Sequence, residues 1–188
     1  MTKTREKDIN ANDRLRKEFK ATIVVGLPAS GRSANIVRPL SSEQAAFVLD
    51  SNEMNKLIPE YMGGLGACLV HEEGKMLTEQ AFKEFTRGSM KGVNLVIPVV
   101  GYDADKLNIK YILPLLDAGY DVEIACTRAD AATCANRVVA RAIEGGVFIP
   151  REIVMSFDDR AVLGAYNEVL ETDYGGKRVK RSKYSEIK

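Results

Sequence analysis

The sequence is poor in the residues that mark metal-binding, disulfide-rich and membrane proteins. It has no tryptophan, one histidine and only three cysteines, Cys68, Cys126 and Cys134, among 188 residues. The cysteines lack the spacing of metal ligands and lie in apolar segments, so we expect reduced thiols in the core. No apolar run approaches the length of a membrane-spanning helix, and the polar start MTKTREKDIN lacks the apolar centre of a signal peptide. These absences predict a soluble, cytoplasmic protein.

A strong charge of either sign is also absent, since the formal net charge is +1. This balance argues against a general nucleic-acid or membrane-binding surface. Residues 172–188 are an exception, because six Lys and Arg against two carboxylates give this segment +4 and leave about −3 for the rest of the chain. We therefore expect a charged N-terminal arm or helix at 1–20, one domain at 21–171 and a basic tail at 172–188.

Apolar and amphipathic segments alternate through residues 21–171. We predict strands at 22–25, 45–49, 93–100 and 121–127, and helices at 33–37, 51–57, 67–90, 105–118, 130–144, from 150, and 158–171. The first helix should stop before Pro39. The alternation predicts an α/β fold with a mainly parallel sheet and helices on both faces. Ligands of such sheets bind at the carboxyl ends of the strands, which nominates Arg32, Asp50 to Asn52, Gly101, Tyr102 and Arg128.

The most specific motif follows the first strand and reads GLPASGRS. It has the spacing of the phosphate loop G-x-x-x-x-G-K-[ST], with Arg32 at the lysine position. Glycines let backbone N–H groups curl around phosphate oxygens, and the next helix points its positive end at the anion. The Ser33 hydroxyl would ligate Mg²⁺. We therefore predict a nucleotide-binding loop formed by Gly26, Leu27, Pro28, Ala29, Ser30, Gly31, Arg32 and Ser33; an ordinary strand–turn–helix is the alternative.

Several segments together resemble the zeta-toxin family of phosphate-loop kinases. They are GLPASGRS, FVLDSNEMNKLIPEY, VHEEGKMLTE, GVNLVIPVVG, AGYDVEIACT and RVVARAIEGGVFIPREIV, spread over residues 22–157. The resemblance implies a three-layer α/β/α P-loop NTPase fold of the nucleotide-kinase kind. It also implies ATP or GTP with Mg²⁺, and transfer of the γ-phosphoryl group to a hydroxyl of UDP-N-acetylglucosamine. In toxin–antitoxin pairs of this family, a small antitoxin protein blocks the nucleotide site.

The family pattern assigns catalytic roles to Arg32, Asp50 and Asn52. Arg32 stands where the family has lysine, Asp50 matches the first acid after the second strand, and Asn52 stands where the family has its catalytic base. An amide cannot accept the substrate proton, so general-base assistance, worth about 10²–10⁴-fold, is lost unless Asp50 or Glu53 supplies it.

The family also uses two arginines late in the domain to stabilise the migrating phosphoryl group. Arg141 matches the first of them and is the fourth predicted catalytic residue, whereas the second falls at Val147. Arg137 and Arg151 are near enough in sequence to substitute for it.

The resemblance further implies a substrate site formed by Glu79, His71, Glu73 and Tyr61. Glu79 matches a substrate-binding glutamate, although a solvated helix face is an equal alternative. His71 lies in VHEEG, where a substrate contact or helix packing is favoured over metal because no second ligand stands at i+4. Tyr61 lines the sugar site or is an ordinary core residue.

Three functions follow from these patterns. The first is a zeta-toxin-like ATP- or GTP-dependent kinase of a nucleotide-sugar hydroxyl, weakened by its departures at Arg32, Asn52 and Val147. The second is a catalytically degenerate nucleotide-binding module of a mobile-element protein. The third is a polynucleotide or modified-base kinase that uses the tail GGKRVKRSK, although such tails are more often solvated ends.

Overall fold

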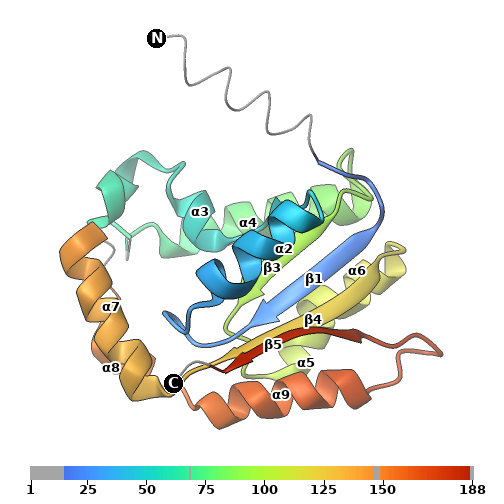
Figure 1. Ribbon diagram of the computed structural model, residues 1–188. Helices are drawn as coiled ribbons and strands as arrows, with labels where there is room; N and C mark the ends of the chain where they lie inside the picture. Colours follow the sequence, from blue (N-terminus) through green and yellow to red (C-terminus); the bar gives the residue numbers. More distant parts are fainter. Residues whose placement is uncertain (1–14, 68, 146–148, 187–188) are drawn as a thin grey trace.

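The computed structural model of the protein describes residues 15–67, 69–145 and 149–186 (Figure 1). Cys68, Val147 and the first fourteen residues of the expected N-terminal segment lie outside this range. A five-stranded sheet with the order β2-β3-β1-β4-β5 forms the centre, and every neighbouring pair is parallel. Its strands are β1 (Lys20–Val25), β2 (Phe47–Val48), β3 (Leu95–Val99), β4 (Asp121–Arg128) and β5 (Lys180–Glu186).

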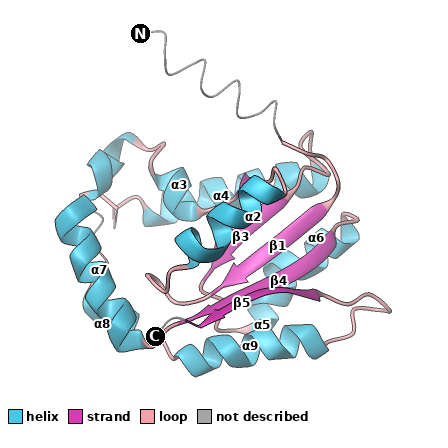
Figure 2. Ribbon diagram, viewed as in Figure 1, coloured by secondary structure: helices cyan, strands magenta, loops and turns pink. Residues whose placement is uncertain are grey.

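Helices cover both faces of this sheet, as Figure 2 shows. They are the π-helix η1 (Ser33–Val37), α2 (Arg38–Glu43), α3 (Ser51–Asn55), the 3₁₀ helix η2 (Pro59–Gly64), α4 (His71–Arg87), α5 (Ala104–Leu107), the π-helix η3 (Asn108–Ile112), α6 (Leu113–Asp117), α7 (Ala131–Gly145), α8 (Arg151–Met155) and α9 (Asp159–Glu171). The predicted three-layer α/β/α architecture is confirmed. No helix in the described ranges is long and apolar enough to cross a bilayer.

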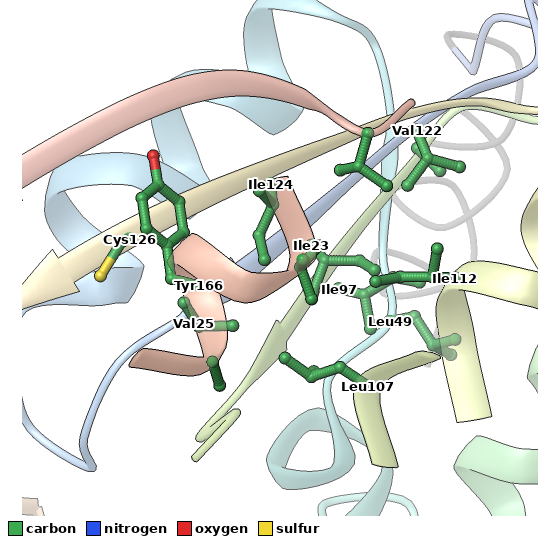
Figure 3. Close-up of a cluster of buried hydrophobic side chains, with 14 of the residues drawn as sticks. Ile23, Val25, Leu49, Ile97, Leu107, Ile112, Val122, Ile124, Cys126 and Tyr166 are labelled. Atoms are coloured by element: carbon green, nitrogen blue, oxygen red, sulfur yellow. The ribbon is translucent and has the colours of Figure 1, made fainter. Parts of the chain in front are cut away.

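The two faces of the sheet bury separate apolar clusters because side chains alternate along each strand. The larger cluster lies under α4, α5, η3, α6 and α9, and Figure 3 shows Ile23, Ile97 and Ile124 from three adjacent strands within it. The smaller cluster lies under η1 and α2. It includes Val24, Val96 and Ala125, which are the direct sequence neighbours of Ile23, Ile97 and Ile124 and therefore lie on the opposite face. Cys126 and Cys134 are free and buried, as expected for core thiols.

The first helix does not stop at Pro39, so that expectation is wrong. The chain stays helical from Ser33 to Glu43, with Pro39 in the first turn of α2. The preceding turn is widened, since the Arg38 N–H donates to the carbonyl of Ser33 five residues back. A proline lacks an N–H and clashes with the carbonyl four residues earlier in a regular helix, and the widened turn relieves this conflict.

Strand β5 is the element that the sequence did not reveal. Its segment KRSKYSE has no apolar alternation, and most of its side chains are exposed at the edge of the sheet. Its basic residues are nevertheless engaged in the fold: Lys180 pairs with Asp121 at 2.7 Å and Lys183 with Glu43 at 3.3 Å. The Arg181 guanidinium lies 5.9 Å from the centre of the Tyr166 ring. The strand therefore forms through backbone pairing and neighbouring charges rather than through burial.

Candidate functional site

The loop Gly26–Ser33 lies at the carboxyl end of β1, the central strand, and leads directly into η1 (Figure 1). Gly26 is enclosed: a Cβ added there would lie 2.6 Å from the carbonyl oxygen of Thr127 and 2.8 Å from Ser30 Oγ. Gly31 has a φ of +89° and Ala29 a φ of +60°, a region that disfavours residues with a side chain. The tight turn thus depends on both glycines of the motif.

Backbone donors gather where this loop meets the helix. None of the described residues accepts a hydrogen bond from the N–H groups of Gly31, Arg32 or Ser33. Such groups at a helix start carry a partial positive charge and suit an anion. The Ser33 side chain is exposed beside them, so its hydroxyl can ligate Mg²⁺ together with phosphate oxygens. The loop therefore fits a magnesium-bound polyphosphate.

Two further polar residues lie beside Gly26: Ser30, which the sequence predicts as part of the nucleotide-binding loop, and Thr127 of β4, to which the sequence analysis gave no role. Both side chains are buried, and neither hydroxyl has a hydrogen-bond partner among the described residues. The Ser30 N–H closes the turn onto the carbonyl of Leu27 at 3.1 Å. A buried hydroxyl without a partner costs about 1–3 kcal/mol.

Arg32 does not lie over the loop amides. One guanidinium nitrogen, Nη1, donates to the carbonyl oxygen of Val99 at the end of β3. Its side chain crosses Gly26, since a Cβ added to Gly26 would come within 3.1 Å of Arg32 Cδ. Burial lowers the pKa of Arg32 to about 10, with the charge of Asp50 opposing the fall and that of Arg141 adding to it. The side chain is thus a cation at neutral pH, directed toward β3.

Asp50 and Asn52 lie at the carboxyl end of β2, where the sequence placed them. Asp50 caps α3, and its Oδ1 accepts from the Asn52 backbone N–H at 2.9 Å and from Asn52 Nδ2 at 3.1 Å. Burial raises the pKa of Asp50, against the lowering effects of the Asn52 N–H and the Arg32 charge. Asp50 is therefore a half-buried carboxylate at this edge, and Asn52 is its hydrogen-bond donor.

Arg141 is exposed on α7, on the side of the sheet to which the arrowheads of β1 and β4 point (Figure 1). Burial is the main cause of the lowered pKa of Arg32, and the positive charge of Arg141 lowers it further. Burial raises the pKa of the Cys134 thiol on the same helix. The charge of Arg137, which is half-buried beside it, opposes this rise. Arg151 is exposed on α8. Two of the predicted catalytic residues, Arg32 and Arg141, are thus close enough to interact.

The predicted substrate residues are spread along α4 and η2. His71 and Glu73 are exposed in the first turn of α4, whereas Glu79 lies about two turns later and pairs with Lys110 of η3 at 2.7 Å. That hydrogen bond and charge lower the pKa of Glu79. Tyr61 is only 8% exposed within η2. The structure does not gather these four side chains into one cavity.

Arg128, nominated by its place after β4, is held by two carboxylates. Its Nε lies 3.3 Å from Asp159 on α9 and its Nη1 lies 3.4 Å from Glu186 on β5. These contacts raise the pKa of Arg128. No group of three or more His, Cys, Asp or Glu side chains that could hold a metal occurs within the described residues.

The signals missed at this site concern close packing. Asn55 is buried at the end of α3, and a Cβ added to Gly74 of α4 would lie 1.6 Å from its Oδ1. Gly74 therefore lets α3, which Asp50 caps, approach α4. A glycine inside an amphipathic helix is the one sequence signal that could have indicated this contact.

Comparison with solved structures shows the same fold in phosphate-loop proteins. A structure of the PezAT chromosomal toxin–antitoxin system of Streptococcus pneumoniae matches with a TM-score of 0.66 at 16% identity, over 88% of this chain and 71% of that one. A proposed kinase of Chloroflexus aurantiacus matches with a TM-score of 0.55 at 13% identity, over 88% of both chains. A chain of the Pnkp1/Rnl/Hen1 RNA repair complex matches with a TM-score of 0.56 at 14% identity, over 87% of this chain and 49% of that one.

Comparison at the level of sequence gives two results. The family description "Zeta toxin" matches residues 4–184, which include the loop, all but the last two residues of β5 and nearly all of the described chain. A search of curated proteins found no match.

Proposed function

Since the chain belongs to the zeta toxin family and has a P-loop kinase fold, we propose that it is a magnesium-dependent phosphotransferase. It binds ATP or GTP at Gly26–Ser33 and transfers the γ-phosphoryl group to a hydroxyl of a nucleotide sugar of the UDP-N-acetylglucosamine type. The observation that carries this proposal is the set of free N–H groups at Gly31, Arg32 and Ser33, at the start of the helix that follows the central strand.

The residues of the loop and of α7 have separate tasks in this proposal. The loop N–H groups hold the phosphates, and Ser33 with the phosphate oxygens holds Mg²⁺, which neutralises charge on the triphosphate. Arg141, exposed on α7 and close enough to affect Arg32, stabilises negative charge on the migrating group. Phosphoryl transfer needs mainly positioning and positive charge, which these groups supply.

The rate of transfer should be low. Arg32 donates to the Val99 carbonyl, so the loop lacks the point charge that lysine would place on the phosphates. Asn52 offers an amide where the family has its base, which removes about 10²–10⁴-fold unless Asp50 accepts the proton. The direction of Arg32 also favours the second candidate, a degenerate module that binds nucleotide without transferring phosphate.

A protein partner is part of the proposal. The PezAT match is to a toxin–antitoxin system, and we propose that a small antitoxin protein covers the loop of this chain as well. The opening beside Gly31 and Ser33 would then be shared between nucleotide and inhibitor. Competition between Mg-ATP and a candidate antitoxin for the purified chain tests this point.

Nucleotide binding and phosphate transfer are measured separately. Mg-ATP or Mg-GTP at millimolar concentration should raise the melting temperature of the wild type, and Ser33→Ala should weaken this effect. Ser42→Ala, at an exposed serine near the end of the same helix, is the matched control and should bind as the wild type does. An unchanged melting temperature with both nucleotides would rule out the kinase and the binding module alike.

Transfer is then followed with γ-labelled ATP and three acceptors. The proposal expects slow labelling of UDP-N-acetylglucosamine. Binding without labelling favours the degenerate module, especially if Arg32→Lys with Asn52→Asp creates activity. Labelling of an oligonucleotide 5′-hydroxyl instead would favour a polynucleotide kinase, although the basic residues Lys180 and Lys183 are already paired with Asp121 and Glu43.

A further inference from the structure

Arg32 and Asp50 follow two different strands, β1 and β2, and both lie at the carboxyl edge of the sheet, where the charge of each acts on the other. We infer that Arg32 is a positioning residue for Asp50, and that Asp50 accepts the proton of the acceptor hydroxyl in place of the base missing at Asn52. The catalytic half of this inference rests on the proposed function. The positioning half concerns only the folded protein.

The strand order brings the two residues together. β3 lies between β1 and β2, and the Leu49 N–H donates to the carbonyl of Val96 at 2.9 Å, so Asp50 follows beside the last residues of β3. The Arg32 guanidinium crosses from the loop of β1 to the Val99 carbonyl at the end of β3. It therefore ends on the strand that lies next to β2, and β2 leads into Asp50.

Hydrogen bonds leave one oxygen of Asp50 free for chemistry. Both donors of Asn52, its backbone N–H and Nδ2, bond to Oδ1 at 2.9 and 3.1 Å. None of the described residues donates to Oδ2. Asn52 thus fixes the carboxylate in one orientation, and Oδ2 can take a proton. The Asn52 amide cannot act as a base, but it orients the Asp50 carboxylate, which can.

The charges around Asp50 agree with this arrangement. Burial raises its pKa, the Asn52 N–H and the charge of Arg32 lower it, and Glu53 on its own helix raises it. The first turn of α4, which packs against α3, adds the exposed His71 and neighbouring acids. Arg32 is the one cation among the causes of the shift, so its removal should make Asp50 harder to ionise.

The transfer step balances with Asp50 as the acceptor of the proton. The acceptor hydroxyl gives its proton to Oδ2 while its oxygen bonds to the γ-phosphorus. The bond from that phosphorus to the bridging oxygen breaks, and the nucleoside diphosphate leaves with the bonding electrons. A second substrate turnover requires only that Asp50 return the proton to water.

The test compares Arg32→Met with Arg38→Met, which removes the same charge from an exposed position six residues along the helix. The carboxyl ¹³C resonance of Asp50, assigned with Asp50→Asn, is titrated by NMR without nucleotide. Arg32→Met should move this titration to higher pH, Arg32→Lys should move it less, and Arg38→Met should leave it unchanged. The rising acid limb of the pH–rate profile should move in the same direction, because only ionised Asp50 accepts the proton.

Nucleotide affinity separates this role from that of a phosphate ligand. We expect Arg32→Met to change the Kd for Mg-ATP by less than about threefold, well under the cost of a lost charged hydrogen bond. If Arg32→Met weakens Mg-ATP binding tenfold or more while Asp50 titrates as in the wild type, the inference is wrong and Arg32 is a phosphate ligand. Asp50→Asn should slow transfer by about 10²–10⁴-fold, and full activity in that variant would remove Asp50 as the base. If the wild type transfers nothing, the proposed function and the catalytic half fail together, and the titration still decides the positioning half.

Discussion

Gly26→Ala is the substitution that most sharply separates a built phosphate loop from an incidental turn. The new methyl carbon would lie 2.6 Å from the Thr127 carbonyl oxygen and 2.8 Å from Ser30 Oγ. The Thr127 atom belongs to the backbone of β4, so it cannot rotate away and the loop must move instead. Overpacking of this kind costs about 1–3 kcal/mol of folding free energy.

A displaced loop should also bind phosphate poorly. Loss of one hydrogen bond from a loop N–H group to a charged oxygen costs about 1.5–3 kcal/mol. Each 1.4 kcal/mol is a factor of ten in affinity, so the Kd for Mg-ATP should rise roughly ten- to hundredfold. Calorimetric titration gives the Kd, and urea unfolding gives the stability of the same sample.

Gly164→Ala is the matched control. Nothing lies within 4 Å of a Cβ added to Gly164, which is exposed within α9. Alanine is about 0.5–1 kcal/mol better than glycine inside a helix, so this variant should be slightly stabilised and bind nucleotide normally. If Gly26→Ala behaves as Gly164→Ala does in both assays, the packing argument for the loop is wrong.

Three other experiments test contacts within the fold and at the site. Tyr120→Phe removes a buried hydroxyl that bonds three backbone groups between residues 85 and 93 at 2.9–3.1 Å, and should cost about 1–3 kcal/mol in urea unfolding. Gly74→Ala should destabilise by about 1–3 kcal/mol through its clash with Asn55, and adding Asn55→Ala should recover part of the loss; a strictly additive double variant would refute the contact. Asp50→Asn should gain stability relative to the wild type as the pH rises above about 4, because the pKa of Asp50 is raised in the folded state and its ionisation there is costly. A difference in unfolding free energy that does not vary with pH would contradict this reasoning.

Much of the fold could be predicted because strands β1, β3 and β4 are largely buried and helices α4, α7 and α9 are long. The apolar runs leading to Val25, Val99 and Cys126 have no amphipathic alternation, as expected for strands covered on both faces. The face of α4 was harder to assign. Leu69, just before it, and Met76 fit the apolar spacing of a helix over residues 67–90 but are 77% and 61% exposed, while the small residues Gly74 and Thr78 are buried. Periodicity counts apolar residues and does not detect a close approach of two backbones.

The candidate site was predictable in its backbone and not in its side chains. The spacing of the motif located the loop, because the motif specifies a strand, a turn and a helix start. Asp50 was nominated by its place after a predicted strand and by the family resemblance. The spacing could not show that Arg32 bonds to the Val99 carbonyl, 67 residues away, since this depends on a rotamer and on the strand order. Strand β5 was missed for a related reason, because an edge strand needs backbone pairing more than apolar residues.

The central claim is that the N–H groups of Gly31, Arg32 and Ser33 hold the phosphates of a nucleotide. The most direct test is a ¹H–¹⁵N NMR titration of the wild-type chain with Mg²⁺ and a non-hydrolysable ATP analogue. Saturable shifts that are largest at these three amides are the predicted result. A titration that leaves these amides unmoved, or that shifts only residues elsewhere in the sheet, would contradict the account.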